Sequence, residues 1–175
     1  MAKSDSFFIR AQVPVDVSPA FSQTEIDLGS FVNLGVSKST LLRIHTISVQ
    51  YADDTGVELP MYSIAAAGAK VAWQLTTQSQ SALVTADDKS MAASGSLTVF
   101  GNSNSTAHAI STSESQDINP QQWRNGYLIA VDAMYLGSDV GGTLTSGAAT
   151  INLVIECTLE NATQASSTAL ALSQQ

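Results

Sequence analysis

The segment Ala149–Asn161 alternates apolar and polar side chains more regularly than any other part of the chain. Its apolar positions recur at every second residue, which is the period of a β-strand with one face in a core and one face in water. The apolar positions are Ile151, Leu153, Ile155, Cys157 and Leu159. This pattern predicts an amphipathic strand that closes a hydrophobic core.

Strand-like segments recur along the rest of the chain, and turn signals separate them. No segment shows sustained helical periodicity, and the expected strands number about eight to ten. The expected strands lie within 7–17, 24–36, 40–51, 57–64, 70–77, 81–95, 96–101, 107–112, 125–137 and 149–161. This pattern predicts an all-β sandwich or barrel in one domain.

Two strands carry local irregularities that the pattern makes visible. In 40–51 the inward positions change phase at His45 and Thr46, which predicts a β-bulge. Pro14 cannot donate a ladder hydrogen bond, so its segment is expected at a sheet edge or in an arm.

Two later segments have unusual polarity for strands. The segment 125–137 is apolar on both faces, as expected for a central strand covered on both sides. The preceding passage, 102–120, is long and polar, and strand character is expected there only around 107–112.

The charge balance argues against nucleic-acid binding. Seven basic residues against fifteen acidic ones give a formal net charge of −8. The basic residues are scattered rather than clustered, so no basic patch is available to displace counterions from phosphates. Charged residues make up only 13% of the chain, against about 25% in ordinary globular domains. Ser, Thr, Asn and Gln must therefore supply much of the polar surface.

Candidate catalytic and metal-binding residues are few. His45 and His108 stand in different contexts, without the closely spaced His pair and carboxylate of a cupin-type metal site. The pairs Asp53-Asp54 and Asp87-Asp88 could supply oxygen ligands for calcium, but turns favour Asp for local hydrogen bonding alone. No catalytic, cofactor-binding or metal residue is therefore assigned, and neither a cofactor nor a small-molecule substrate is expected. The chain is not expected to be an enzyme.

The single cysteine and the two tryptophans favour structural roles. Cys157 lies on the apolar side of its strand, and nothing nearby in the sequence supplies a base for a reactive thiol. Trp73 alternates with apolar neighbours and is expected in the core. Trp123, in "NPQQWRNG", is better placed for an outer or interfacial role.

The two ends of the chain are expected to lie outside the barrel. No signal-peptide pattern and no membrane-length apolar run is present, so synthesis in a cytoplasm is expected. Residues 1–175 are expected to form a single domain, with an N-terminal arm at 1–12, a β-barrel core at 13–161 and a C-terminal tail at 162–175. The tail is interpreted either as an assembly arm that docks onto neighbouring copies or as a frayed end.

The order of these features resembles that of a known family of viral proteins. An extended "FFIRAQVPV" precedes the strong early strand "LLRIHTISVQY", and the polar loop in "INPQQWRNGYLIAVDAMYLG" leads into a late strand. The strand in "ATINLVIECTLEN" closes the order. This arrangement resembles the single jelly-roll major capsid proteins of icosahedral viruses, especially those of archaeal and bacterial viruses with an internal membrane.

The resemblance implies a jelly-roll barrel of about eight strands in two facing antiparallel sheets, with extended N- and C-terminal arms. It implies a structural subunit of a virion, which assembles with copies of itself and with a second capsid protein into an icosahedral shell. It also implies that a viral membrane can lie beneath that shell.

Two other functions remain open. A pilus or fibre subunit that assembles by strand exchange would share the logic of terminal arms. A jelly-roll carbohydrate-binding module would expose aromatic side chains on one sheet, which an aromatic content of 6% does not favour. An enzyme of the cupin type is the least favoured because the chain lacks the ligands.

Overall fold

The computed structural model describes residues 5–35, 38–53, 55–57, 69–104, 107–142, 144 and 147–174, with the backbone alone for 99–104 and 107–112. Within these ranges nine strands form two antiparallel sheets. A short 3-10 helix η1 (Pro120–Gln122) lies between the sixth and seventh strands, and a helix α1 (Gln164–Ser173) follows the last strand. Residues 58–64 of one expected strand lie outside the described residues. No helix in the described ranges is long and apolar enough to cross a membrane.

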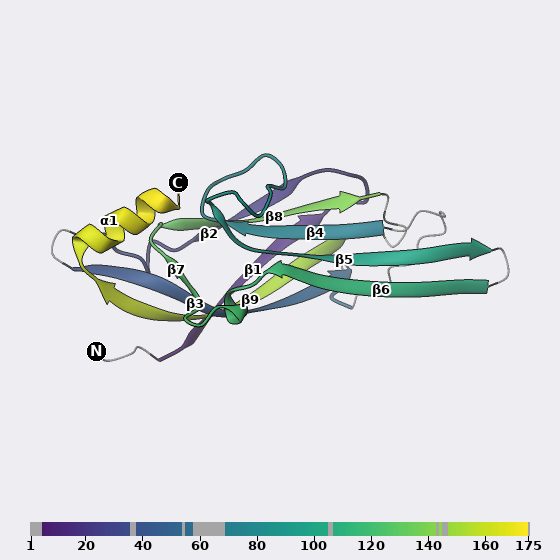
Figure 1. The fold of residues 1–175 in the computed structure, drawn as a ribbon. Helices are drawn as coiled ribbons and strands as arrows, with labels where there is room; N and C mark the ends of the chain where they lie inside the picture. The colour runs from purple at the N-terminus through teal and green to yellow at the C-terminus, as the bar shows by residue number, and fades with distance from the viewer. Residues whose placement is uncertain are drawn as a thin grey trace.

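The four-stranded sheet contains the first and the last strand of the chain. Its strands lie in the order β1 (Phe7–Val15), β9 (Ala149–Ala162), β3 (Ser39–Asp53), β7 (Tyr127–Ile129). The five-stranded sheet has the order β2 (Ser22–Asp27), β8 (Ala133–Gly141), β4 (Ala69–Thr76), β5 (Met91–Asn104), β6 (Ala107–Ile118). Figure 1 shows α1 at one end of these sheets, and the β5–β6 hairpin extends beyond β4 and β8 at the other end.

The strand pairing is that of a jelly roll. Early strands pair antiparallel with late ones, β1 with β9, β2 with β8 and β3 with β7, while β4 pairs with β5. The chain therefore folds back on itself as one long hairpin, and that hairpin is rolled so that successive pairs alternate between the sheets. Strand β6 adds a further strand at the edge of the five-stranded sheet. The predicted all-β jelly roll is confirmed.

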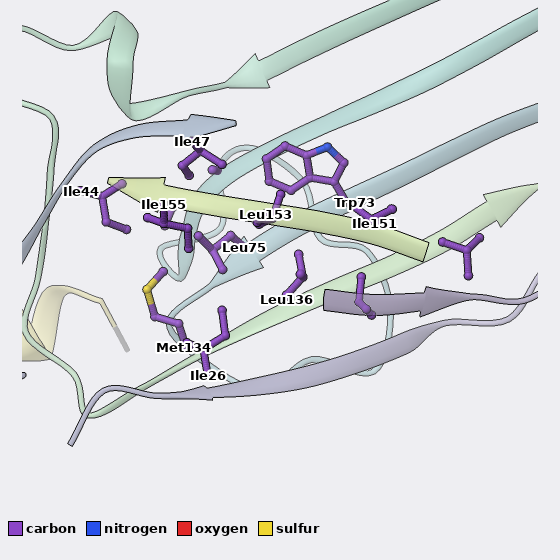
Figure 2. Close-up of a cluster of buried hydrophobic side chains, with 14 of the residues drawn as sticks. Ile26, Ile44, Ile47, Trp73, Leu75, Met134, Leu136, Ile151, Leu153 and Ile155 are labelled. Atoms are coloured by element: carbon purple, nitrogen blue, oxygen red, sulfur yellow. The ribbon is translucent and has the colours of Figure 1, made fainter. Parts of the chain in front are cut away.

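The core lies between the sheets and follows the period-two pattern. Ile151, Leu153 and Ile155 of β9 are at most 2% exposed, and Figure 2 shows them facing Leu75 and Leu136 of the opposite sheet. Burying a side chain of this size contributes about 1.5–3 kcal/mol of stability. These strands are therefore held together chiefly by interdigitated aliphatic side chains.

Trp73 and Tyr51 form a polar contact inside the core. The indole Nε1–H of Trp73 donates to the Tyr51 hydroxyl at 3.1 Å, which links β4 to β3 across the barrel. Gly95 makes room for the indole, since a Cβ there would lie 2.9 Å from Nε1. Trp73 is 3% exposed, which confirms its predicted core position.

Three local predictions on the strands are confirmed. The register between β3 and β9 shifts between Ile44 and Thr46, which places the bulge at His45. Pro14 lies in β1, an edge strand of its sheet, which is where proline is tolerated. Cys157 is a buried free cysteine. Burial, with a smaller contribution from Glu156, raises its thiol pKa to about 12.

The segment 125–137 is not one central strand, as its apolar pattern suggested. It divides into β7 in the four-stranded sheet and the start of β8 in the five-stranded sheet. The chain crosses between sheets at Ala130–Asp132, and both Ala130 and Val131 are buried. The segment is apolar on both sides because it contributes to both layers, not because one strand is covered twice.

Strand β6 is also longer than its sequence suggested. It runs over Ala107–Ile118 and pairs along β5, although its described side chains from Ser113 to Asp117 are mostly exposed. Backbone hydrogen bonds to β5 hold such a strand at a sheet edge without an apolar face. For this reason hydrophobic periodicity could not reveal it.

Both ends differ from the predicted arms. Residues 7–12 pair with β9 throughout, so they belong to the barrel, whose first strand begins at Phe7 and not at residue 13. Residues 164–173 form α1 and not an extended arm. Thr163 caps the helix by accepting a hydrogen bond from the Ser166 N–H. Its composition of Ala, Leu and Ser permits a helix but carries no strong helical pattern.

Candidate interaction surfaces

Helix α1 packs back onto the barrel through one narrow face. The more buried positions of α1 and its C-cap are spaced at i, i+3, i+4 and i+7, the spacing of one helical stripe. These positions are Ser167, Leu170, Ala171 and Gln174. The Ser167 hydroxyl lies 2.7 Å from that of Ser39 on β3, in a buried hydrogen bond. Leu172, on the other side of the helix, is 67% exposed.

Gln174 completes the edge of β7. Its side-chain amide donates to the Leu128 carbonyl at 2.6 Å and accepts from the Ala130 N–H at 3.1 Å. These are the groups that a neighbouring strand would use, so the amide replaces one residue of a strand. Thr77 donates to the Gln174 carbonyl at 2.6 Å. Gln174 is 2% exposed.

Gln121 has the same role further along this side of the four-stranded sheet. The Ile47 N–H of β3 donates to its side-chain oxygen at 2.9 Å, and its nitrogen donates to the Ile47 carbonyl at 3.5 Å. Two glutamine side chains therefore occupy backbone groups that a strand from another chain would need. Both glutamines stand outside any apolar pattern, so no signal in the sequence marks their role.

A polar pocket of about 520 Å³ opens on the four-stranded sheet beside the β3 bulge. Its lining residues are Arg43, His45, Arg124, Asn125, Thr158 and Glu160. They come from β3, from the end of β9 and from the turn that precedes β7. We call this hollow the basic pocket.

Arg43, which lines the basic pocket, contacts both Glu160 and Asn125. Its Nε and Nη2 donate to the two carboxylate oxygens of Glu160, the second at 2.6 Å, and Nη1 donates to the Asn125 carbonyl. The bidentate hydrogen bond to Glu160 raises the pKa of Arg43, and burial opposes part of this effect. Glu160 holds the Arg43 guanidinium in place, and the hydrogen bond from Arg43 to the Asn125 carbonyl attaches the turn to the sheet.

Gly126 brings that turn close to β3. Its φ of +64° lies in the left-handed region, and a Cβ there would lie 2.1 Å from the Ile44 carbonyl oxygen. The Gly126 N–H donates to the Trp123 carbonyl and closes the turn that carries Arg124. Trp123 packs at 5.2 Å, centroid to centroid, on Tyr127 and is 40% exposed. Its predicted outer position is confirmed.

The structure does not bring the two histidines together. His45 lies at the bulge, where its Nε2 is 2.8 Å from the Thr158 hydroxyl. His108 lies on β6, paired with Ser103 in the other sheet, and its side chain is outside the described residues. Among the described residues no group of three or more His, Cys, Asp or Glu side chains could hold a metal ion.

The described members of the two aspartate pairs form hydrogen bonds within turns. The Asp53 carboxylate accepts hydrogen bonds from Thr55 and Val57, which lowers its pKa. Asp88 accepts from the Ser90 N–H and hydroxyl, with the same effect on its pKa. Asp87 accepts from the Thr85 hydroxyl. Local hydrogen bonding therefore accounts for these three residues, and Asp54 lies outside the described residues.

No family model matches this chain, and no curated protein matches its sequence. Among solved structures the chain is similar to the VP1 protein of Trichodysplasia spinulosa-associated polyomavirus, solved in complex with sialylated glycooligomers. The identity is 10%, the coverage 89% of this chain and 95% of that chain, and the TM-score 0.37. It is also similar to a chain of Desmodium yellow mottle tymovirus, at 7% identity, 89% and 87% coverage and a TM-score of 0.35. Because both TM-scores are low, the jelly-roll assignment depends on the strand pairing of this chain.

Proposed function

We propose that this protein is a structural subunit of an icosahedral viral capsid. The observation that supports this proposal most directly is the jelly-roll pairing of β1 with β9, β2 with β8 and β3 with β7. The same order of strands and loops was the basis of the resemblance to single jelly-roll capsid proteins. Fold alone does not define function, so the surfaces of the molecule must supply the rest of the argument.

The described polar groups support a scaffold rather than an enzyme. His45 is held by Thr158, and Asp53 and Asp88 are used within turns. The thiol of Cys157 is buried, with its pKa raised to about 12. Each of these potential catalytic groups therefore has a structural use or an environment that opposes ionisation. We propose that the chain has no catalytic role and requires no cofactor.

The filled backbone groups on the β7 side of the four-stranded sheet argue against strand exchange on that side. Gln174 occupies backbone groups at the edge of β7, and Gln121 occupies those of Ile47 on β3. A donor strand would have to displace both side chains before it could pair on this side. We propose that subunits meet on this side through side chains, loops and α1. Co-assembly with a second capsid protein over a viral membrane is the finer form of this proposal.

Electron cryomicroscopy of particles from the native source tests the proposal. The expected result is a closed icosahedral shell in which density for this jelly roll repeats with the particle symmetry. The same map would show whether a second capsid protein and a membrane are present. Filaments built from this chain, or its absence from purified particles, would contradict the proposal.

Glycan binding is the second candidate, and one observation favours it. Trp123 is exposed and packed on Tyr127, next in sequence to Arg124 of the basic pocket. An exposed indole beside hydrogen-bonding side chains is suited to a sugar ring. A glycan array compared between the wild type and Trp123→Ala tests this function. Binding that disappears in the variant would establish it, and an array without signal would reject it.

A further inference from the structure

The basic pocket concentrates positive charge in an acidic protein. The whole chain has seven Lys and Arg and two His residues against fifteen Asp and Glu. Two of these arginines and one histidine line the pocket, together with the single carboxylate of Glu160. A cluster of this kind attracts anions to a molecule whose net charge otherwise repels them.

One cation in the pocket is left without a partner charge. Glu160 neutralises Arg43 in the bidentate pair. Arg124 is exposed, and no described carboxylate lies within ion-pair distance of it. The pocket therefore presents one uncompensated guanidinium, beside the ring of His45. A monoanionic carboxylate suits such a site better than a dianion, which Glu160 would repel more strongly.

Strand β6 carries carboxylates of the required kind, outside the lining of the pocket. Among the described strands β6 is the last of the five-stranded sheet, and it bears Glu114 and Asp117, both exposed. No described cation forms an ion pair with either side chain. Their negative charge adds to burial in raising the pKa of Tyr51, the larger effect being burial. A copy of this chain therefore offers an acidic strand and a basic pocket that share no residue.

We propose that, between neighbouring copies in an assembly, the basic pocket of one copy binds a single β6 carboxylate, that of Glu114 or Asp117, of the next. This inference rests on the proposed function, because it requires many copies held side by side. The contact joins two different sets of residues. Where each copy gives its pocket to one neighbour and its β6 edge to another, the contact is heterologous and propagates from copy to copy around a ring. It also brings opposite charges together and so reduces the repulsion between chains that each carry a net charge of −8.

Charge reversal at the pocket is the first test. Arg124→Glu is expected to reduce assembly of the purified protein at least tenfold, measured by sedimentation velocity and electron microscopy. Arg10→Glu is the matched control, since Arg10 is an exposed arginine on β1 of the same sheet and outside the pocket. This control is expected to assemble like the wild type. Circular dichroism and thermal melts check that both variants are folded.

Exchange of charge between the pocket and β6 tests whether the β6 carboxylates of a neighbouring copy occupy the pocket. The double variant Glu114→Lys/Asp117→Lys is expected to fail in assembly alone, as Arg124→Glu does. An equal mixture of the two is expected to assemble, because each pocket then meets an edge of opposite charge. Glu25→Lys, which reverses an exposed carboxylate on the other edge strand β2, is the control and is expected to assemble normally.

The outcomes separate this inference from the proposed function. Normal assembly of Arg124→Glu, or a mixture that fails to assemble, would overturn the pocket contact while leaving the capsid proposal in place. A wild type that never assembles, alone or in its native particle, would overturn both. Loss of glycan binding in Arg124→Glu with unchanged assembly would assign the pocket to sugars and also reject the intersubunit contact.

Discussion

The interior of the barrel and the attachment of α1 are held by different kinds of interaction. Between the sheets, aliphatic side chains such as Leu153 and Leu136 are at most 1% exposed and interdigitate in two layers. Helix α1, in contrast, is anchored by the hydroxyl of Ser167 and by the hydrogen bonds of Gln174, and it leaves Leu172 exposed. Burial of large apolar surface scales with area, whereas a few hydrogen bonds depend on geometry at single atoms.

This difference indicates which part of the molecule can change without loss of the fold. The barrel core is distributed over many side chains, so the sheets do not depend on α1 for their apolar contacts. The helix depends on a few polar contacts, so it can be detached at a smaller cost. Four predictions follow, in order of decreasing expected effect.

A charge in the barrel interior is expected to have the largest effect. Leu153→Asp places a carboxylate in a core whose described buried residues include no Lys or Arg. The cost of such an unpaired buried charge is comparable to the whole usual stability of about 5–15 kcal/mol. We expect the variant not to fold, as judged by the loss of cooperative thermal unfolding in circular dichroism. A variant that unfolds cooperatively near the wild-type temperature would contradict the assigned direction of the β9 side chains.

Alkaline pH is expected to weaken the barrel through two buried acids. The pKa of Cys157 rises from an ordinary value of 9.0 to about 12, and that of Tyr51 from 10.0 to about 12, in each case chiefly because of burial. The folded chain therefore retains protons that the unfolded chain releases. The contribution of these two groups to the free energy of unfolding should be constant below about pH 8 and fall as the pH rises towards about 12.

Urea unfolding at several pH values measures this effect. Each unit of pKa shift corresponds to about 1.4 kcal/mol, so the fall should reach a few kcal/mol. Cys157→Ala and Tyr51→Phe should each flatten the pH dependence, whatever their effect at neutral pH. A slope that neither variant changes would mean that other groups cause the alkaline loss.

Removal of the Gln174 side chain is expected to have an intermediate effect on the attachment of α1. Gln174→Ala leaves the Ala130 N–H and the Leu128 carbonyl buried without their partner, which costs about 1–3 kcal/mol. Hydrogen exchange should accelerate in α1 and at Ala130 while the β9 amides remain protected. Leu172→Ala, on the exposed side of the helix, is the control and should change stability little. Uniform acceleration across β9 would show that the helix and the barrel unfold as one unit.

The smallest effect is expected on the solvent side of β9. Glu156 lies between two buried positions and is itself partly exposed. Glu156→Gln should therefore change the free energy of unfolding by less than about 0.5 kcal/mol. Chemical denaturation of the two proteins side by side measures this difference. A large loss of stability would show that the side chain at 156 has a structural role that its position does not suggest.

The strands that face the core could be predicted from the sequence because their side chains obey a local rule. Ile151, Leu153 and Ile155 alternate with polar residues, and the phase change at His45 revealed the bulge. A strand that lies on a sheet must place successive side chains on opposite faces, so burial on one face appears directly in the order of residues.

Other elements could not be predicted because contacts with distant parts of the chain determine them. The division of 125–137 into β7 and β8 depends on where the chain crosses between sheets, and both sides of a crossing can be apolar. Strand β6 is held by the backbone of β5, so its side chains carry little pattern. The basic pocket joins residues of β3, β9 and the turn at Asn125, and no spacing in the sequence connects them.

By itself, the sequence determined that this chain forms a β-sandwich with an apolar interior, because alternation along a strand is a local consequence of backbone geometry. Only the tertiary structure decided that the C-terminal segment is a helix seated on the barrel. The hydrogen bonds of Ser167 and Gln174 reach partners that are 128 and 44 residues away. It also decided that Arg43, His45 and Arg124 share one pocket, because those contacts exist only after distant strands have paired.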